Sequence, residues 1–217
     1  MSPRLPPERP MPIGFPATCL RATLYILLVA GISQGAYYEA LYQPEARFSE
    51  RGFTELAQSV LLALSTLLLL YVRVGLRELP HVSLMLLAFV AGSLVREQDA
   101  LLDAHVADGA WQLLVALIIL PCLYSVIRHR REFAAQFVGY ASSFSFGLFA
   151  AGFLTTYVFS RLHGRGEMWQ AIREDSARIF KDAAEEGVEL FGYALILIAM
   201  IELFLLTRHW ARARRTS

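Results

Sequence analysis

Four acidic residues open the last long apolar run of the chain, where their carboxylates would lie close to membrane hydrocarbon. Asp182, Glu185, Glu186 and Glu189 stand at the start of KDAAEEGVELFGYALILIAMIELFLL. Ionised carboxylates are costly at that depth, so they usually have a partner, a proton, a metal ion or a chemical role there. The spacing of Asp182, Glu186 and Glu189, at i, i+4 and i+7, predicts that they share one face of one helix.

Other apolar runs carry polar residues at their ends as well. Glu55 and Gln58 begin the run that follows SERGF, and Arg96, Glu97 and Asp99 close the run that ends in SLVREQD. Lipid offers no hydrogen bonds, so polar stripes on membrane helices usually turn inward. The sequence therefore predicts that these side chains meet in one pocket, open to the outer side of the membrane.

Several carboxylates in one pocket would suit a hard divalent cation, because such ions take oxygen ligands. A water molecule activated by the metal could then attack a lipid or a lipid-linked substrate. The sequence accordingly favours a metal-dependent hydrolase or transferase. The residues predicted as catalytic are Glu55, Glu97 and Glu189; those predicted to bind substrate are Arg96, Gln58, Tyr38 and Tyr193; and the predicted metal ligands are Glu55, Glu97, Asp99, Glu186 and Glu189.

Two other functions fit the same residues. One carboxyl group could exchange protons in an ion- or proton-coupled transporter. Alternatively, the acids could hold a partner helix in a non-catalytic assembly subunit of a membrane complex. A purely structural role also stays open, because acids in a first helical turn complement the helix dipole and Arg96 could pair with Glu97 or Glu189.

Composition and motifs argue against some classes of function and offer no template for others. No H-E-x-x-H, Walker or G-x-S-x-G motif is present, so no template of a soluble enzyme applies. The formal net charge is only +1 and the basic residues are spread over short segments, which argues against nucleic-acid binding. Anionic headgroups of membrane lipids explain these bases and are the expected partners. The sequence leaves the oligomeric state open.

The elements that must position these residues are membrane-spanning helices. Hydrophobic residues make up 56% of the chain, and a spanning helix needs about 20 predominantly apolar residues. The sequence predicts an all-α integral membrane protein, a bundle of six transmembrane helices with a short interfacial helix between spans 5 and 6, from Met168 onward. The six predicted spans are 20–38, 55–75, 82–96, 111–127, 136–159 and 187–207.

The distribution of charge predicts the orientation and the domain organisation. If the N-terminus lies inside, the cytoplasmic segments hold 12 of the 20 Lys and Arg residues, as the positive-inside rule requires. We therefore expect both termini in the cytoplasm and the protein in a bacterial inner membrane. Residues 1–19 are expected to form a proline-rich cytoplasmic tail, 20–207 the six-span membrane domain, and 208–217 a basic cytoplasmic tail.

Overall fold

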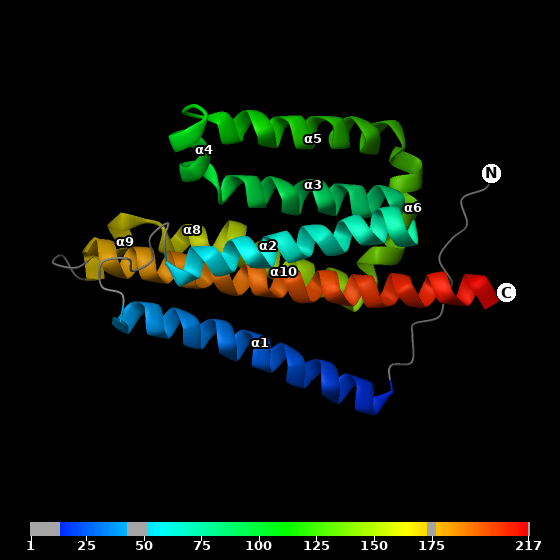
Figure 1. The fold of residues 1–217 in the computed structure, drawn as a ribbon, viewed down its shortest axis with the longest axis horizontal. Coiled ribbons are helices and arrows are strands. Elements are labelled where there is room, and N and C mark those ends of the chain that lie inside the picture. The colour runs from blue at the N-terminus through cyan, green and yellow to red at the C-terminus, as the bar shows by residue number, and fades with distance from the viewer. Residues whose placement is uncertain (1–13, 43–51, 173–176, 217) are drawn as a thin grey trace. The chain divides into compact units, whose positions relative to one another are not determined.

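The computed structural model describes residues 14–42, 52–172 and 177–216. Within these residues the chain is helical and contains no strand (Figure 1). Two π-helical stretches, η1 and η2, continue α2 and α7. In chain order the elements are α1 (Phe15–Tyr42), α2 (Phe53–Leu70), η1 (Tyr71–Leu76), α3 (Pro80–Arg96), α4 (Asp99–His105), α5 (Ala110–Arg128), α6 (Arg130–Ala141), α7 (Phe144–Phe153), η2 (Leu154–Phe159), α8 (Ser160–His163), α9 (Gly166–Ile172) and α10 (Ala177–Thr216).

Four helices among the described residues are long and apolar enough to cross a membrane. They are α1, the continuous helix Phe53–Leu76, α5, and the stretch Phe180–Arg214 of α10. A fifth crossing results if α6 and the helix Phe144–His163, bent by 96°, form one broken span. The chain is thus compatible with an α-helical membrane protein that has four or five apolar spans.

The predicted count of six spans is not confirmed. The segment predicted at 82–96 is α3, an apolar helix of 17 residues, which is shorter than a typical span. The segment predicted as one helix at 136–159 is interrupted between α6 and α7. These two segments account for the difference.

Ser143 explains the interruption. Its hydroxyl lies 2.6 Å from the carbonyl oxygen of Tyr140 and accepts a hydrogen bond from the backbone N–H of Phe146 at 3.2 Å. Serine bonds locally to backbone groups in this way and so favours helix starts over helix interiors. The same side chain closes α6 and caps α7.

The described residues fall into two compact units. Unit 1 comprises 62–148 and 197–216, and unit 2 comprises 14–42, 52–61, 149–172 and 177–196. The helices α2, α7 and α10 each contribute one part to each unit.

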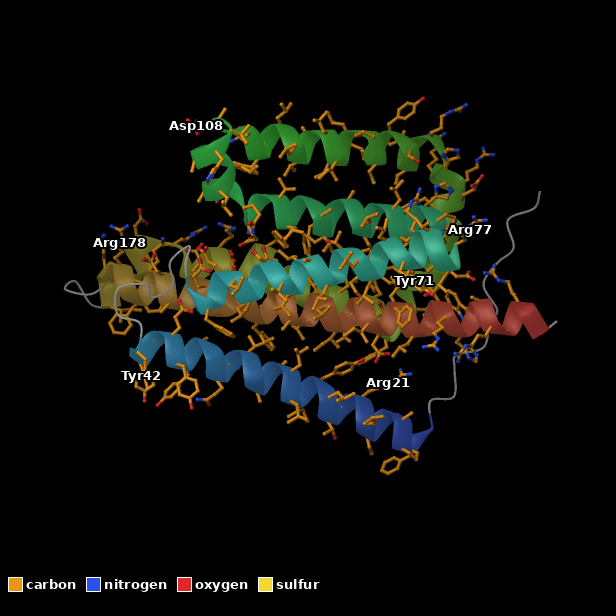
Figure 2. All side chains as sticks on the ribbon, viewed as in Figure 1. Arg21, Tyr42, Tyr71, Arg77, Asp108 and Arg178 are labelled. Atoms are coloured by element: carbon orange, nitrogen blue, oxygen red, sulfur yellow. The ribbon has the colours of Figure 1, made fainter. Side chains whose placement is uncertain are left out.

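In unit 1, α3 and α5 lie side by side, with α4 connecting them at one end and α6 following at the other (Figure 1). Gly92 of α3 faces Val115 and Ile119 of α5, whose side chains would lie 3.8 and 3.7 Å from an added Cβ. Figure 2 shows Asp108 at one end of this helix pair and Arg77 at the opposite end. Unit 1 therefore has an acidic end and a basic end.

In unit 2, α1 contacts the start of α2. The ring of Phe53 occupies the space that a side chain at position 35 would need, so Gly35 lets α2 approach the backbone of α1. One turn further along α1, Glu39 is almost fully buried, with 1% of its surface exposed. The contact of Gly35 with Phe53 and the burial of Glu39 place the end of α1 against the first turn of α2.

Candidate functional site

The acidic start of α10 is packed against the helix Phe144–His163 by a contact between two backbones. A Cβ at Gly152 would lie 2.8 Å from the carbonyl oxygen of Gly192, and one at Gly192 would collide with the Thr156 hydroxyl. Small residues allow this approach, which is common between membrane helices. Close packing of this kind brings Ser160 and Arg161, which follow Gly152 on the same helix, to the acids of α10.

Glu189 lies in this interface and is only 6% exposed. The hydroxyl of Ser160 donates a hydrogen bond to Glu189 Oε1 at 3.1 Å and also contacts the backbone oxygen of Thr156. The Nη2 atom of Arg161 lies 3.3 Å from the same carboxylate oxygen. A buried carboxylate is thus held by a hydroxyl and a guanidinium from a neighbouring helix, as buried charges require.

Glu185 extends the charged contacts toward the surface. Its carboxylate lies 3.7 Å from Arg161 Nη1 and 3.5 Å from Lys181 Nζ. A Cβ on Gly164 would come within 2.6 Å of Glu185 Oε1, so this glycine leaves room for the carboxylate. Arg161 therefore bridges two acids that lie one turn apart on α10.

Glu186 is held from the other side, by α2. Gln58 is fully buried, and its Nε2 donates to Glu186 Oε2 at 2.9 Å and to the Glu186 backbone oxygen at 3.3 Å. The other end of the amide, Gln58 Oε1, is buried and has no hydrogen-bond partner in the described part of the chain. We call Gln58, Ser160, Arg161, Glu185, Glu186 and Glu189 the polar cluster of unit 2.

A further buried carboxylate, that of Glu39, contacts the start of α2, the helix that carries Gln58. Glu39 Oε2 accepts hydrogen bonds from the backbone N–H of Thr54 at 2.7 Å and from its hydroxyl at 2.6 Å. The first N–H groups of a helix have no partner within the helix, and an anion there also complements the helix dipole. Glu39 thus caps the helix that carries Gln58.

The polar cluster has more carboxylates than cations. Three of its members are acids and one, Arg161, is a cation, while Lys181 beside the cluster pairs with Glu185 and with Asp182, each at 3.5 Å. Glu55, one turn before Gln58 on α2, is half-buried in the same unit. Carboxylates gathered in an apolar environment favour binding of a proton or a cation.

Three of the predicted site residues belong to unit 1. Arg96 Nη2 lies 2.8 Å from Glu97 Oε1, an ion pair between neighbours in the sequence. Asp99 is exposed, and its Oδ1 accepts a hydrogen bond from the N–H of Ala100 at 2.7 Å. Glu55 and Glu189 lie in unit 2, so the predicted meeting of Glu97 with these two acids stays a prediction.

The two predicted tyrosines occupy different environments in unit 2. Tyr38 is 54% exposed, and its ring centre lies 6.0 Å from that of Tyr37 and 5.8 Å from that of Tyr42. Tyr193 is fully buried and meets the Tyr157 ring edge-on at 6.5 Å. Tyr193 continues the buried face of α10 from Glu189, as its spacing predicts.

No group of three or more His, Cys, Asp or Glu side chains in the described residues is arranged to hold a metal ion. The divalent cation expected at Glu55, Glu97, Asp99, Glu186 and Glu189 stays a prediction.

Four residues of this region were not predicted as site residues: Glu39, Thr54, Ser160 and Arg161. A signal for Ser160 was present, because Gly152, Thr156 and Ser160 recur at intervals of four and so mark one small or polar face of a helix.

No protein-family model, no curated protein sequence and no solved structure matches this chain.

Proposed function

We propose that this chain is a multi-pass membrane protein that transports an ion, and that the polar cluster of unit 2 binds the coupling proton or cation. The observation that carries the proposal is Glu189. It is 6% exposed, lies on an apolar helix long enough to span a membrane, and is held by Ser160 and Arg161 of another helix. Ionisable residues in such positions commonly belong to ion pathways or proton relays.

The backbone of the neighbouring helix supports this reading. The π-helical stretch η2, Leu154–Phe159, lies directly before Ser160 and Arg161. Single π turns within α-helices occur frequently at functional sites. The broken helix at Ser142 and Ser143 is a second irregularity, and interrupted helices are common in transporters, where they line cavities.

For the topology we propose six spans. The helix α3 counts as one crossing, and the bent pair of α6 and Phe144–His163 together counts as another. Both termini then lie in the cytoplasm of a bacterium, and the protein lies in the inner membrane. The polarity of unit 1 supports this orientation. Figure 2 shows Arg77 at one end and Asp108 at the other. Arg128 and Arg130 stand where α5 gives way to α6, and Asp99 begins α4. Short loops rich in Arg and Lys usually stay cytoplasmic.

A hydrolase or transferase acting on a lipid-linked substrate is the second candidate. Arg161 favours it, because its side chain is 52% exposed although its partner Glu189 is buried. A half-exposed guanidinium can bind an anionic headgroup in a bidentate manner. Ser160 and Glu189 would then lie beside the bound headgroup.

Ion flux into sealed vesicles tests the transport proposal. Purified protein is reconstituted in liposomes that enclose a pH-sensitive dye, and a pH, Na⁺ or K⁺ gradient is applied. We expect a change in internal pH that depends on the protein, that Glu189→Gln abolishes and that Glu167→Gln, at an exposed position of α9, retains. Flux equal to that of empty liposomes, or full flux through a folded Glu189→Gln variant, would contradict the proposal.

A further inference from the structure

The amide of Gln58 has one satisfied end and one unsatisfied end. Its Nε2 donates to the Glu186 carboxylate at 2.9 Å, whereas its Oε1 is buried without a hydrogen-bond partner in the described part of the chain. The side chain is fully buried, so solvent does not reach this oxygen. A buried acceptor without a donor is rare in folded proteins and usually marks an absent ligand, water or proton.

The missing donor can be a proton on Glu186. A primary amide presents a donor and an acceptor side by side, whereas a carboxylate presents acceptors alone. A carboxylic acid presents both, and can therefore close a ring of two hydrogen bonds with an amide. In that pair Nε2 keeps its bond to one oxygen of Glu186, and the O–H on the other oxygen donates to Gln58 Oε1.

We propose that Glu186 is the carboxyl that binds the coupling proton and that Gln58 is the acceptor that stabilises the bound form. This inference rests on the proposed function and names its ion. Binding forms one O–H bond on Glu186 from a proton delivered by water, and it removes one negative charge from the polar cluster. Release leaves the arrangement in which Nε2 alone contacts the carboxylate.

The surrounding charges are consistent with a proton at this position. Arg161 contacts Glu185 and Glu189, and Lys181 contacts Asp182 and Glu185, so several carboxylates gather on this stretch of α10. Neutralising Glu186 relieves repulsion among like charges. The titratable and charged groups that unit 2 carries on these elements include Lys181, Asp182, Glu185 and Glu189 on α10, Glu55 on α2, Arg161 on α8 and Glu39 on α1.

Infrared difference spectroscopy during a pH titration tests the proposal on the full chain in lipid vesicles. A protonated carboxyl group gives a C=O stretching band that an ionised carboxylate lacks. We expect such a band in the wild type, and we expect Glu186→Gln to remove it. Gln58→Leu should move it to higher frequency, because the acid loses its hydrogen-bond acceptor. Glu167→Gln should leave it unchanged.

Glu186→Gln is a suitable variant because glutamine is isosteric with the protonated acid and can form the same two hydrogen bonds with Gln58. We expect this variant to have the same unfolding temperature as the wild type. We also expect its stability to lose the part of the pH dependence that Glu186 contributes. If the band persists in Glu186→Gln, or is absent from the wild type throughout the titration, the proposal is wrong. A cation bound near Gln58 Oε1 would also leave the wild type without the band, since Glu186 would stay ionised.

The outcomes also separate this inference from the transport function. A band that disappears in Glu186→Gln, together with no ion flux, would support the proton site and contradict transport. Ion flux in the wild type, together with a band that Glu186→Gln does not affect, would support transport and overturn the assignment of the proton to Glu186.

Discussion

The carboxylate of Glu39 on α1 caps the start of α2 through two hydrogen bonds from Thr54, to the backbone nitrogen at 2.7 Å and to the hydroxyl at 2.6 Å. Both residues are buried, and Gln58 follows Thr54 on the next turn of α2. The position of Gln58 against Glu186 therefore depends on the cap that Glu39 provides one turn earlier.

Replacement of Glu39 should destabilise unit 2. We expect Glu39→Ala to lower the free energy of unfolding by about 2–3 kcal/mol, because it leaves the N–H and the hydroxyl of Thr54 buried without this acceptor. Denaturant titration in detergent micelles measures the change. Glu167→Ala removes an exposed carboxylate and should change stability by less than about 0.5 kcal/mol. Equal stability of the two variants would show that the cap contributes little.

Gly192 and Gly187 provide a matched pair on α10. A methyl group at position 192 would collide with Thr156 and approach the Gly152 carbonyl oxygen to 3.0 Å, whereas position 187 has nothing within 4 Å. Gly192→Ala should lose about 1–3 kcal/mol through overpacking. Gly187→Ala should gain up to about 1 kcal/mol, because alanine favours the helix. Thermal unfolding in detergent gives the sign of each change, and a stabilised Gly192→Ala would refute the backbone contact.

Arg161 should matter more than another arginine near α10. Arg161→Met removes the cation from the buried Glu189, whereas Arg178→Met removes a side chain that is 92% exposed and lies 3.9 Å from Asp182. Because Arg161 is itself half-exposed, we expect a loss of about 1–2 kcal/mol, between the values for surface and buried pairs. Chemical unfolding of both variants measures the difference. Arg161→Lys should restore part of the loss, and no difference between the two methionine variants would contradict the role of Arg161.

The proposed orientation predicts which residues a membrane-impermeant maleimide reaches in intact cells. In a variant without the native thiols of Cys19 and Cys122, a cysteine at Asp108 should react from outside. A cysteine at Arg130 should react only after the membrane is permeabilised. The reverse pattern would place the basic end of unit 1 outside, and labelling of both positions in intact cells would mean that they do not lie on opposite sides.

The helices could be predicted from composition because an apolar run with charged ends has few alternatives in a membrane. The run predicted at 111–127 is α5, Ala110–Arg128, and the run at 20–38 lies within α1, Phe15–Tyr42. The break at Ser143 could not be predicted in the same way. Serine also occurs in closely packed helix interfaces, and only the bonds of its hydroxyl to Tyr140 and Phe146 distinguish the two cases.

The candidate site was predictable in part. Gln58 and Glu186 were predicted in separate roles, and the structure joins them at 2.9 Å. Ser160 and Arg161 were not predicted, because the pairing of their helix with α10 depends on the contact between Gly152 and Gly192. Gly152 lies two turns before Ser160 on the same helix, and Gly192 lies on α10. Periodicity identifies the face of one helix but not the helix that it contacts.

The contact between Gly152 and Gly192 has a mechanical consequence. Where two backbones touch, one helix cannot slide along the other without forcing a bulkier residue, such as Ile196, through the point of contact. Within unit 2 this contact therefore resists sliding of the two helices. In the proposed transport cycle we expect other segments of unit 2, such as α1 and the opening turns of α2, to move first.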